Sequence, residues 1–371
     1  MHPLIKWPGG KTRELEKIEK YIPQYDRYIE PFFGGGALFF SLKPKKAAIN
    51  DISSSLVEFY ELIKRQDQQL YGLLMCYSNS FVNLIKVCEE NYSDIFRLYD
   101  TYARNLDLVE TGQQLSSLLE SLSERINSGF GGSLVLDSAA FYASLRKNVL
   151  DKIHRTYKNN LKKPFSAEDM ESNLLTGFTS GYYMYFRDIY NAINSRRMAP
   201  PSVQYKVANF YFIREYCYGS MFRYNARGEF NIPYGGISYN KKNLRSKIDS
   251  MFCEETHDLF SETDINCSDF EPFPESLSLG KRDFVFLDPP YDSDFSDYDG
   301  KAFTRSDHER LANFLKRTSA QFILVIKNTP FIRSLYEEDF NTLSFDKQYT
   351  YNVRSRNDRD TEHLIITNLP V

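Results

Sequence analysis

The 371-residue chain has few of the features that mark secreted, zinc-binding or membrane proteins. Its cysteines are odd in number and form no C-x-x-C pair, which argues against a disulfide framework and against a zinc site. We therefore expect no bound metal and a reducing, cytoplasmic location. The five cysteines are Cys76, Cys88, Cys217, Cys253 and Cys267.

Long apolar runs are also missing. None approaches the length needed to span a membrane, and the first residues contain no apolar stretch typical of a signal peptide. Strong net charge is absent too, because the formal charge is −3 and the pI is about 6.1. Any nucleic-acid partner must therefore be met by a local basic patch, and we expect no membrane partner.

The order of the segments predicts an α/β fold with a large helical insertion. Residues 1–62 and 260–371 alternate short apolar runs with glycine turns and amphipathic stretches, which predicts one discontinuous α/β domain. Within it, residues 265–270 predict a short strand ending in an acid, and residues 349–353 and 363–367 predict a final hairpin around a charged turn at 354–360. Residues 63–259 are mostly of helical periodicity, which predicts a second domain. The length supports two domains, or one domain with a large insertion.

An unusual tetrapeptide, Asp288-Pro289-Pro290-Tyr291, directly follows the apolar run at residues 284–287. Proline cannot donate to a sheet ladder, so the predicted strand ends here. In an open α/β sheet, ligands bind at the carboxyl ends of strands. A carboxylate, bare proline carbonyls and a flat tyrosine ring suit a planar ring with an exocyclic amine. A proline-rich turn without a ligand explains the tetrapeptide alone equally well.

A second candidate site is the stretch from Tyr28 to Phe40, which reads as strand, glycine turn and helix. This is the layout of a nucleotide-binding first turn, with Gly34 and Gly36 in the turn. The spacing is not G-x-G-x-x-G and no Lys-Ser/Thr follows, so neither a dinucleotide nor ATP is indicated. Asp51 ends the next strand, where an acid can bind ribose hydroxyls or cap the following helix.

Two further segments have mixed interpretations. The turn from Lys6 to Lys11 could bring Trp7 and Lys11 to a ligand, or could only cap a helix. The Arg- and Tyr-rich segment from Met221 to Gly235 predicts a hairpin-like loop whose arginines suit nucleic acid, or a plain connecting loop. A basic run could be a solvated helix face or a phosphate-contacting surface: Arg146, Lys147, Lys152, Arg155, Lys158, Lys162 and Lys163.

The motifs occur in the order K-W-P-G-G-K, E-P-F-F-G-G-G, N-D, F-R-Y-N-x-R-G-E-F-N-x-P-Y-G and D-P-P-Y. This ordered set resembles the DNA adenine methyltransferase (Dam) family, in its α-group arrangement. The resemblance spans nearly the whole chain. It implies a Rossmann-like sheet that binds S-adenosylmethionine, and a mostly helical target-recognition domain whose hairpin spans residues 221–236. The partner that it implies is double-stranded DNA.

The resemblance also implies roles for particular residues. The catalytic residues would be Asp288, Pro289 and Tyr291. The cofactor-binding residues would be Trp7, Lys11, Phe32, Gly34, Gly36, Asp51, Asp269, Phe270 and Asp288. The DNA-binding residues would be Arg187, Met221, Arg223, Asn225, Arg227 and Pro233, with Arg223 in the place of the guanine-reading arginine. Residues 217–221 and Gly236 depart from the family pattern, so the recognised sequence is left open.

The implied reaction moves a methyl group to the 6-amino group of an adenine. The adenine must flip out of the duplex, at a cost of roughly a few kcal/mol. Tyr291 would stack on it, while Asp288 and the Pro289 carbonyl would bind its amine. We expect a monomer or weak dimer. Two alternatives are a methyltransferase of the same fold acting on RNA or a protein amide, and a catalytically silent DNA-binding relative.

Overall fold

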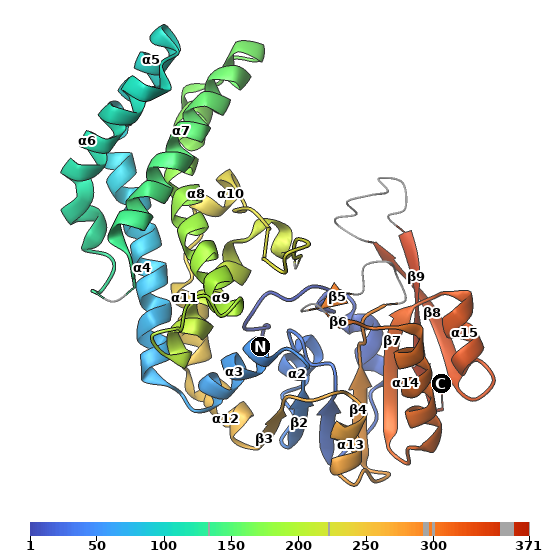
Figure 1. Ribbon diagram of the computed structural model, residues 1–371. Helices are drawn as coiled ribbons and strands as arrows, with labels where there is room; N and C mark the ends of the chain where they lie inside the picture. The colour runs from blue at the N-terminus through green and yellow to red at the C-terminus, as the bar shows by residue number, and fades with distance from the viewer. Residues whose placement is uncertain (133, 222, 292–296, 299–300, 349–359, 371) are drawn as a thin grey trace. The chain divides into compact units, whose positions relative to one another are not determined.

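The computed structural model describes residues 1–132, 134–221, 223–291, 297–298, 301–348 and 360–370. The chain divides into two compact units (Figure 1). One unit combines Met1–Arg65 with Cys253–Val371, and the other is Gln66–Phe252. The sequence prediction placed these borders at 62/63 and 259/260.

The first unit is built around a seven-stranded sheet in the order β3-β2-β1-β4-β7-β9-β8. Five neighbouring strands are parallel, whereas β9 is antiparallel to both of its neighbours. The strands are β1 (Arg27–Glu30), β2 (Ala47–Asn50), β3 (Thr263–Asn266), β4 (Asp283–Leu287), β7 (Gln321–Lys327), β8 (Asn341–Gln348) and β9 (Asp360–Thr367). The short pair β5 (Asp297–Tyr298) and β6 (Lys301–Ala302) lies outside this sheet. The mixed α/β fold expected from the sequence is confirmed.

The strand order places a topological switch point in the middle of the sheet. From β1 the chain builds outward through β2 and β3, and it then returns to place β4 on the other side of β1. Connections leave the sheet in opposite directions on either side of this point, so a crevice opens at the carboxyl ends of β1 and β4. This crevice is where the fold positions a ligand.

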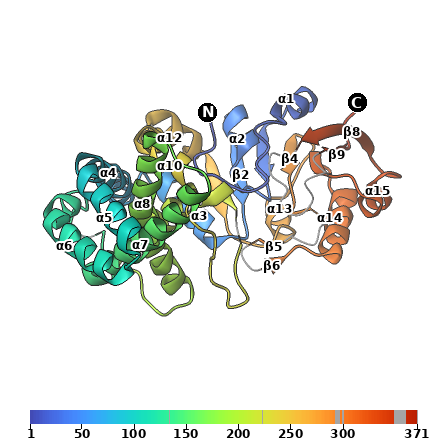
Figure 2. The same ribbon diagram turned by 90° about the horizontal axis from the view of Figure 1, so that it is seen from above.

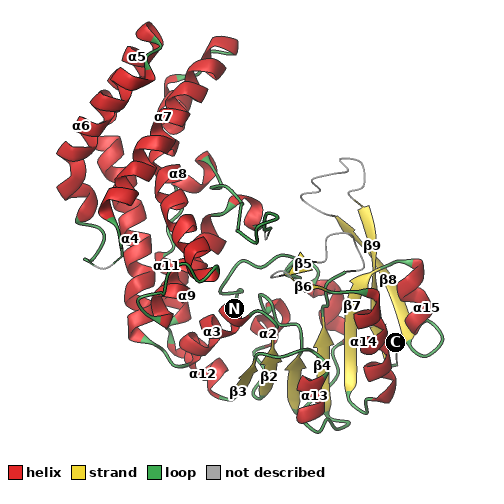
Figure 3. Ribbon diagram, viewed as in Figure 1, coloured by secondary structure: helices red, strands yellow, loops and turns green. Residues whose placement is uncertain are grey.

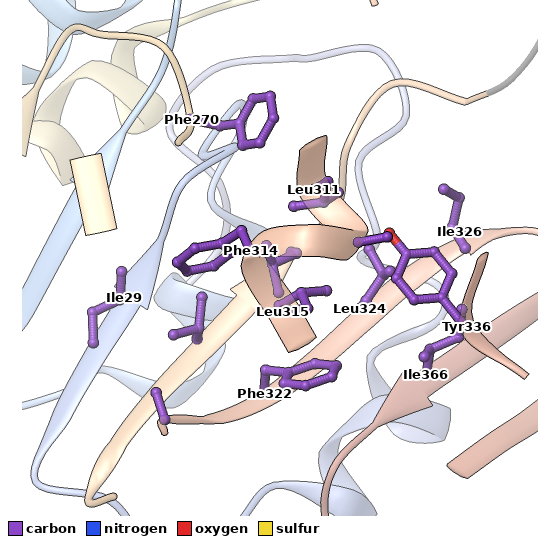
Figure 4. Packing of buried hydrophobic residues seen from close by; sticks show 14 of the residues in the cluster. Ile29, Phe270, Leu311, Phe314, Leu315, Phe322, Leu324, Ile326, Tyr336 and Ile366 are labelled. Atoms are coloured by element: carbon purple, nitrogen blue, oxygen red, sulfur yellow. The ribbon is translucent and has the colours of Figure 1, made fainter. Parts of the chain in front are cut away.

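Both faces of the sheet are covered by apolar side chains. On one face α14 (Arg305–Arg317) lays Leu311, Phe314 and Leu315 over strand residues such as Phe322 and Leu324 (Figure 4). On the other face the rings of Tyr28 and Phe284 contact each other, and Tyr28 also meets Phe39. Burial on both faces explains why the central strands are continuous apolar runs.

The remaining helices of this unit are short, and they connect the strands. They are α1 (Leu15–Ile18), η1 (Glu19–Tyr21), α2 (Ala37–Leu42), α3 (Ser54–Lys64), α12 (Glu254–Ser261), α13 (Pro272–Ser276) and α15 (Pro330–Tyr336). The predicted helix at residues 37–42 is confirmed, and it starts at the glycine turn because Gly36 takes the left-handed φ of +63°.

The second unit is mostly helical in its described residues (Figure 3). Its long helices pack side by side, as the view in Figure 2 shows. They are α4 (Gln68–Glu90), α5 (Tyr92–Asn105), α6 (Leu108–Asn127), α7 (Ser138–Lys162), α8 (Ala167–Asn194) and α9 (Val203–Tyr216). They are followed by η2 (Tyr218–Ser220), α10 (Ile237–Asn240) and α11 (Arg245–Met251). Aspartate or serine caps several of these helices, for example Asp107 at α6 and Ser166 at α8.

The 217–236 segment folds back on itself without forming regular strands. Two isolated antiparallel bridges join Cys217 to Tyr234 and Tyr224 to Phe230. Inside the second bridge, the Asn225 side-chain oxygen accepts from the backbone N–H groups of Arg227 and Glu229, at 2.9 and 3.0 Å. The expected hairpin-like loop is therefore present, and Asn225 organises its turn.

One predicted strand ends earlier than expected, and one predicted hairpin lies partly outside the described residues. The strand expected at residues 265–270 is β3, and it ends at Asn266, because the side-chain amide of Asn50 bonds the backbone of Ser268 beyond it. Most of the first arm and turn of the predicted final hairpin, residues 349–359, lies outside the described residues. No helix of the described chain is long and apolar enough to cross a membrane.

Candidate active site

A cavity of about 490 Å³ opens at the switch point of the sheet, entirely within the first unit. It is lined by residues that directly follow β1, β2 and β4, by the loop after β3, and by the turn at residues 7–11. Cavities of this size bind small organic ligands in many proteins. The loops meet here because parallel strands bring their carboxyl ends to one edge.

The glycine turn is shaped by its contact with the only tryptophan of the chain. Gly34 has a φ of +50°, and a Cβ built there would lie 2.7 Å from Cδ1 of Trp7. Gly36 has a φ of +63°, and its Cβ would lie 2.5 Å from the Phe33 ring. Side chains are thus excluded by both conformation and space, so the bare backbone faces the cavity.

Asp51 fixes the far end of the glycine turn. Its carboxylate accepts from the backbone N–H groups of Gly34, at 2.8 Å, and Ser53, at 2.9 Å. The N-cap of α3 is Ser53, so the alternative in which Asp51 caps this helix is wrong. A carboxylate has about four lone-pair sites, so a carboxylate in this place can also accept from ligand hydroxyls.

Lys11 joins the two ends of the D-P-P-Y motif. Its ammonium forms an ion pair with the Asp288 carboxylate and lies 2.7 Å from the Tyr291 hydroxyl. The lysine is only 2% exposed, and it also donates to the Gly9 carbonyl at 3.2 Å. Tyr291 packs edge-on against the buried His363 ring, with centroids 5.1 Å apart. The acid and the tyrosine are therefore held by a cation from the other end of the chain.

Three phenylalanines form an aromatic wall of the cavity. Phe32 stacks on Phe270 with centroids 5.2 Å apart, and Phe303 packs against both rings. Beside this wall the Asp269 carboxylate accepts from Arg310 at 2.6 Å. Arg310 also binds Glu271 and Asp307, and its guanidinium lies over the Phe270 ring. Asp269 is therefore part of an ion-pair network at the rim.

The structure brings all the predicted catalytic and cofactor-binding residues to this one cavity. Each of them lines it: Trp7, Lys11, Phe32, Gly34, Gly36, Asp51, Asp269, Phe270, Asp288, Pro289 and Tyr291. They come from five separate stretches of the chain, so the fold alone unites them. Among the described residues, no group of three or more His, Cys, Asp or Glu side chains is arranged to hold a metal ion.

The predicted DNA-binding residues lie in the second unit. Arg223, Arg227 and Pro233 are exposed, and Met221 is half-buried. Asn225 holds the turn through its own side chain. Arg187 is not on the 217–236 segment but on α8, where its guanidinium donates to the Ile232 carbonyl at 3.4 Å. Their contact with DNA stays a prediction.

A comparison with known families decides the class of this protein. The model of the D12 class N6 adenine-specific DNA methyltransferases matches residues 7–129 and 130–351. The chain belongs to this family. The resemblance seen in the ordered motifs is thereby confirmed.

Curated relatives of this methyltransferase cover nearly the same length. The chain is 28% identical over 372 residues to Type II methyltransferase M.CviBI of Paramecium bursaria Chlorella virus NC1A, covering 99% of this chain and 100% of the relative. It is 25% identical to Type II methyltransferase M.MjaIII of Methanocaldococcus jannaschii, covering 90% and 88%. It is 20% identical to a DNA adenine methylase of Vibrio cholerae, covering 96% and 92%.

Among the lining residues of this methyltransferase that the sequence did not point to, Glu30 and Phe303 are the two with the clearest contacts to the site. Glu30 ends β1, is 2% exposed and accepts from the Tyr28 hydroxyl at 2.8 Å. Burial first, and then the charges of Asp288 and Asp51, raise the pKa of Glu30 well above its usual value. The feature of the sequence that could have pointed to Glu30 is its place in the E-P-F-F-G-G-G motif. Phe303 carried no signal, because only folding brings it beside Phe32.

Proposed function

We propose that this chain transfers a methyl group from S-adenosylmethionine to the 6-amino group of an adenine in a short duplex DNA sequence. Membership in the D12 class supports adenine in DNA as the acceptor. The observation that carries the active-site assignment is the Lys11–Asp288–Tyr291 contact at the cavity. It holds a carboxylate and an aromatic ring together beside the glycine turn.

The residues of the cavity fit the proposed cofactor. The bare backbone at Gly34 and Gly36 allows close approach, and the Asp51 carboxylate can accept from ribose hydroxyls. The aromatic wall of Phe32, Phe270 and Phe303 offers flat surface for a purine ring. The cofactor would supply a methyl group on a sulfonium. The family establishes a methyl donor in general, and these residues favour this one.

The acceptor amine would be oriented by Asp288 and Pro289. The amine lone pair of adenine is conjugated into the ring and is a weak nucleophile. Hydrogen bonds from the two amine hydrogens to the Asp288 carboxylate and the Pro289 carbonyl favour a pyramidal nitrogen. Tyr291 would stack on the flipped base. Most of the acceleration would then come from positioning and fixed dipoles.

The ion pair with Lys11 suits this role. A carboxylate has about four lone-pair sites, enough for the ammonium and an amine together. The Lys11 charge stabilises the anionic form of Asp288, which accepts hydrogen bonds more strongly than a neutral acid. The tyrosine hydroxyl, bound to the same ammonium, is fixed in place before the base arrives.

The experiment that tests this proposal is methylation of plasmid DNA in a host without adenine methylation. Nanopore sequencing and mass spectrometry of digested DNA would report N6-methyladenine and the sequence around it. The wild-type chain should modify adenine at one short motif. Asp288→Asn should lower the methylation rate by at least about 100-fold, because the amide presents a donor to the amine. Asp264→Asn, on the exposed side of β3, should leave the rate unchanged.

Cofactor binding separates a failed site from a failed fold. Trp7 is the only tryptophan and lines the cavity, so its emission should change when S-adenosylmethionine binds. Asp288→Asn should still give this change. A wild-type protein that binds the cofactor but leaves all adenines unmodified would contradict the proposal, and RNA and protein amides would then be tested. Within this proposal we also expect a monomer or weak dimer in the reducing cytoplasm, where the five free cysteines stay reduced.

A further inference from the structure

A second hollow lies in the helical unit, far along the chain from the active-site cavity. It is a groove of about 470 Å³ between α7, α8 and the 217–236 segment. In Figure 1 these two helices run side by side. The groove is lined by Asn148, Lys152, Arg155, Thr156, Asn159, Asn173, Thr176, Ser180, Met184, Arg187, Pro233, Tyr234 and Gly236.

The two helices beside the groove pack closely against each other. A Cβ at Gly177 would lie 3.0 Å from Cα of Val149, and one at Gly181 would lie 2.7 Å from Cα of Leu145. The two backbones therefore touch where these glycines lie. A hydrogen bond from the Ser144 hydroxyl to the Gly181 carbonyl, at 2.8 Å, adds to this contact.

The helices turn polar stripes toward the groove. The lining residues of α7 follow helical spacing, from Asn148 through Lys152 and Thr156 to Asn159. Those of α8 follow it from Asn173 through Ser180 to Arg187. The charged side chains of the lining are all basic, and none of the lining residues is an aspartate or a glutamate.

The positive charge of the groove is not matched by an acidic lining residue. Lys152, Arg155 and Arg187 form no ion pair among the described residues, although the charge of Arg187 acts on the carboxylate of its neighbour Asp188. Burial first, and then the neighbouring charge of Arg155, lower the pKa of Lys152 to about 8. A depressed lysine pKa means that bringing this charge into the folded protein costs free energy, which a bound anion would return.

Two residues that line the groove also hold a buried polar atom without a hydrogen bond. The Thr156 hydroxyl, in a residue 1% exposed, and the Arg187 Nε have no partner among the described residues. Such groups are rare, because an unsatisfied buried donor destabilises the fold. Both can donate, so a ligand oxygen that reached them would remove this cost.

We infer that the groove between α7 and α8 binds the phosphodiester backbone of the substrate DNA. This rests on the proposed function, and it adds side chains of α7 and α8 to the 217–236 segment as a surface that holds the DNA backbone. The stripe from Asn148 to Asn159 is roughly 16 Å long at about 1.5 Å per residue. One DNA strand carries a phosphate per about 3.4 Å of helix axis, so the stripe can face several phosphates.

The 217–236 segment is fixed to the same helix that carries Arg187. The Asn191 side chain exchanges two hydrogen bonds with the Phe230 backbone, at 2.8 and 3.0 Å. The Tyr183 hydroxyl donates to the Ile232 carbonyl at 3.0 Å. A strand held in the groove would thus be held in register with the exposed arginines of that segment.

Only part of the basic run belongs to this groove. Lys152 and Arg155 line it, whereas Lys158, Lys162 and Lys163 are exposed outside it. Arg146 is turned toward α6, where its Nε donates to the Gly112 carbonyl and the Ser116 hydroxyl. The same helix therefore offers matched lysines for a control.

The test compares Lys152→Gln/Arg155→Gln with Lys158→Gln/Lys162→Gln, which removes the same charge from the same helix. Binding of a fluorescein-labelled DNA duplex that carries the methylated motif is measured by anisotropy over a range of salt concentrations. The groove pair should weaken binding at least about tenfold and should lower the slope of log K against log salt by about two. The control pair should change the affinity and the salt slope by no more than half of what the groove pair changes them.

Kinetics and a second pair of variants exclude a simple folding defect. The groove pair should raise KM for DNA and leave kcat and the Trp7 response to S-adenosylmethionine unchanged. Lys152→Arg/Arg155→Lys should restore binding. Asn159→Asp, which adds a negative charge to the groove wall, should weaken binding, whereas Gln113→Glu on the exposed face of α6 should not.

The outcomes separate this inference from the proposed function. Equal losses in the groove and control pairs, with wild-type methylation intact, would overturn the groove alone. If the groove pair lost more affinity for an RNA duplex of the same sequence than for DNA, the groove would be assigned to RNA, and the inference would also be overturned. A wild-type protein that neither binds DNA nor methylates adenine would instead overturn the proposed function.

Discussion

Replacing Asp288 by alanine should do more than remove a catalytic group, because it leaves the Lys11 ammonium in a buried site. Lys11 is 2% exposed, and the Asp288 side chain is 19% exposed. Removing one member of a buried pair typically costs about 3–5 kcal/mol. The Gly9 carbonyl and Tyr291 hydroxyl still accept from Lys11, so we expect the lower end, about 3 kcal/mol.

This loss of stability can be measured from the unfolding of the unit that contains the active site. Trp7 is the only tryptophan, and it belongs to the unit that contains the sheet, so its emission reports the unfolding of that unit. For a unit of this size, about 3 kcal/mol corresponds to a Tm lowered by roughly 6–12 °C. Urea unfolding with the same probe gives the free energy directly.

A double-mutant cycle tests whether Lys11 is the cause. Lys11→Met keeps the length of the side chain without its charge, so Lys11→Met/Asp288→Ala no longer buries a cation that has lost its carboxylate. The double variant should be less destabilised than the sum of the single variants by about 2 kcal/mol, and it should remain inactive. An Asp288→Ala protein that unfolds within about 2 °C of wild type, or additive single effects, would refute this reasoning.

Two further outcomes concern acid stability and the glycine turn. Burial alone would raise the pKa of Glu215, but the charges of Lys247 and Lys242 lower it to about 2. The stability that Glu215 contributes is therefore present above pH 4.5 and is lost as the pH falls from about 4.5 to about 2. Unfolding of Glu215→Gln followed by circular dichroism should show lower stability at pH 7 and a flatter dependence of stability on acid pH, with the exposed Glu120→Gln as control; a pH dependence like that of wild type would contradict this. Gly34→Ala should weaken S-adenosylmethionine binding at least about tenfold, through backbone strain and the clash with Trp7. Gly72→Ala should not weaken it, because nothing lies within 4 Å of its Cβ. Calorimetry measures the two affinities for the cofactor, and equal affinities would show that the turn tolerates a side chain.

The sequence predicted the parts of this protein whose signal is local. Asp288 to Tyr291 follows an apolar run and contains two prolines, so the end of β4 could be placed without a structure. The glycines before Ala37 marked the turn and the start of α2 in the same way. The order of five such motifs then identified the family, which the D12 model confirms. Each of these signals depends on residues within a few positions of one another.

Contacts between distant residues could not be predicted in this way. A lysine in a glycine turn gives no sign that it will be buried against a carboxylate 277 residues later, as Lys11 is. Asp269 carried an acid's signal for ligand binding, yet only the fold shows that Arg310 holds it. Such pairings depend on the strand order, which short-range periodicity does not encode.

By itself the sequence determined the α/β class, the family, and the stretches that end at the active site, because backbone conformation and apolar periodicity are set by neighbouring residues. Only the tertiary structure decided which side of each stretch faces the cavity and which charges are buried together. It also divided the basic run of α7, placing Lys152 on a groove and Lys158 outside it. Helical spacing put these lysines on different faces, and the packing of α8 decided which face became a site.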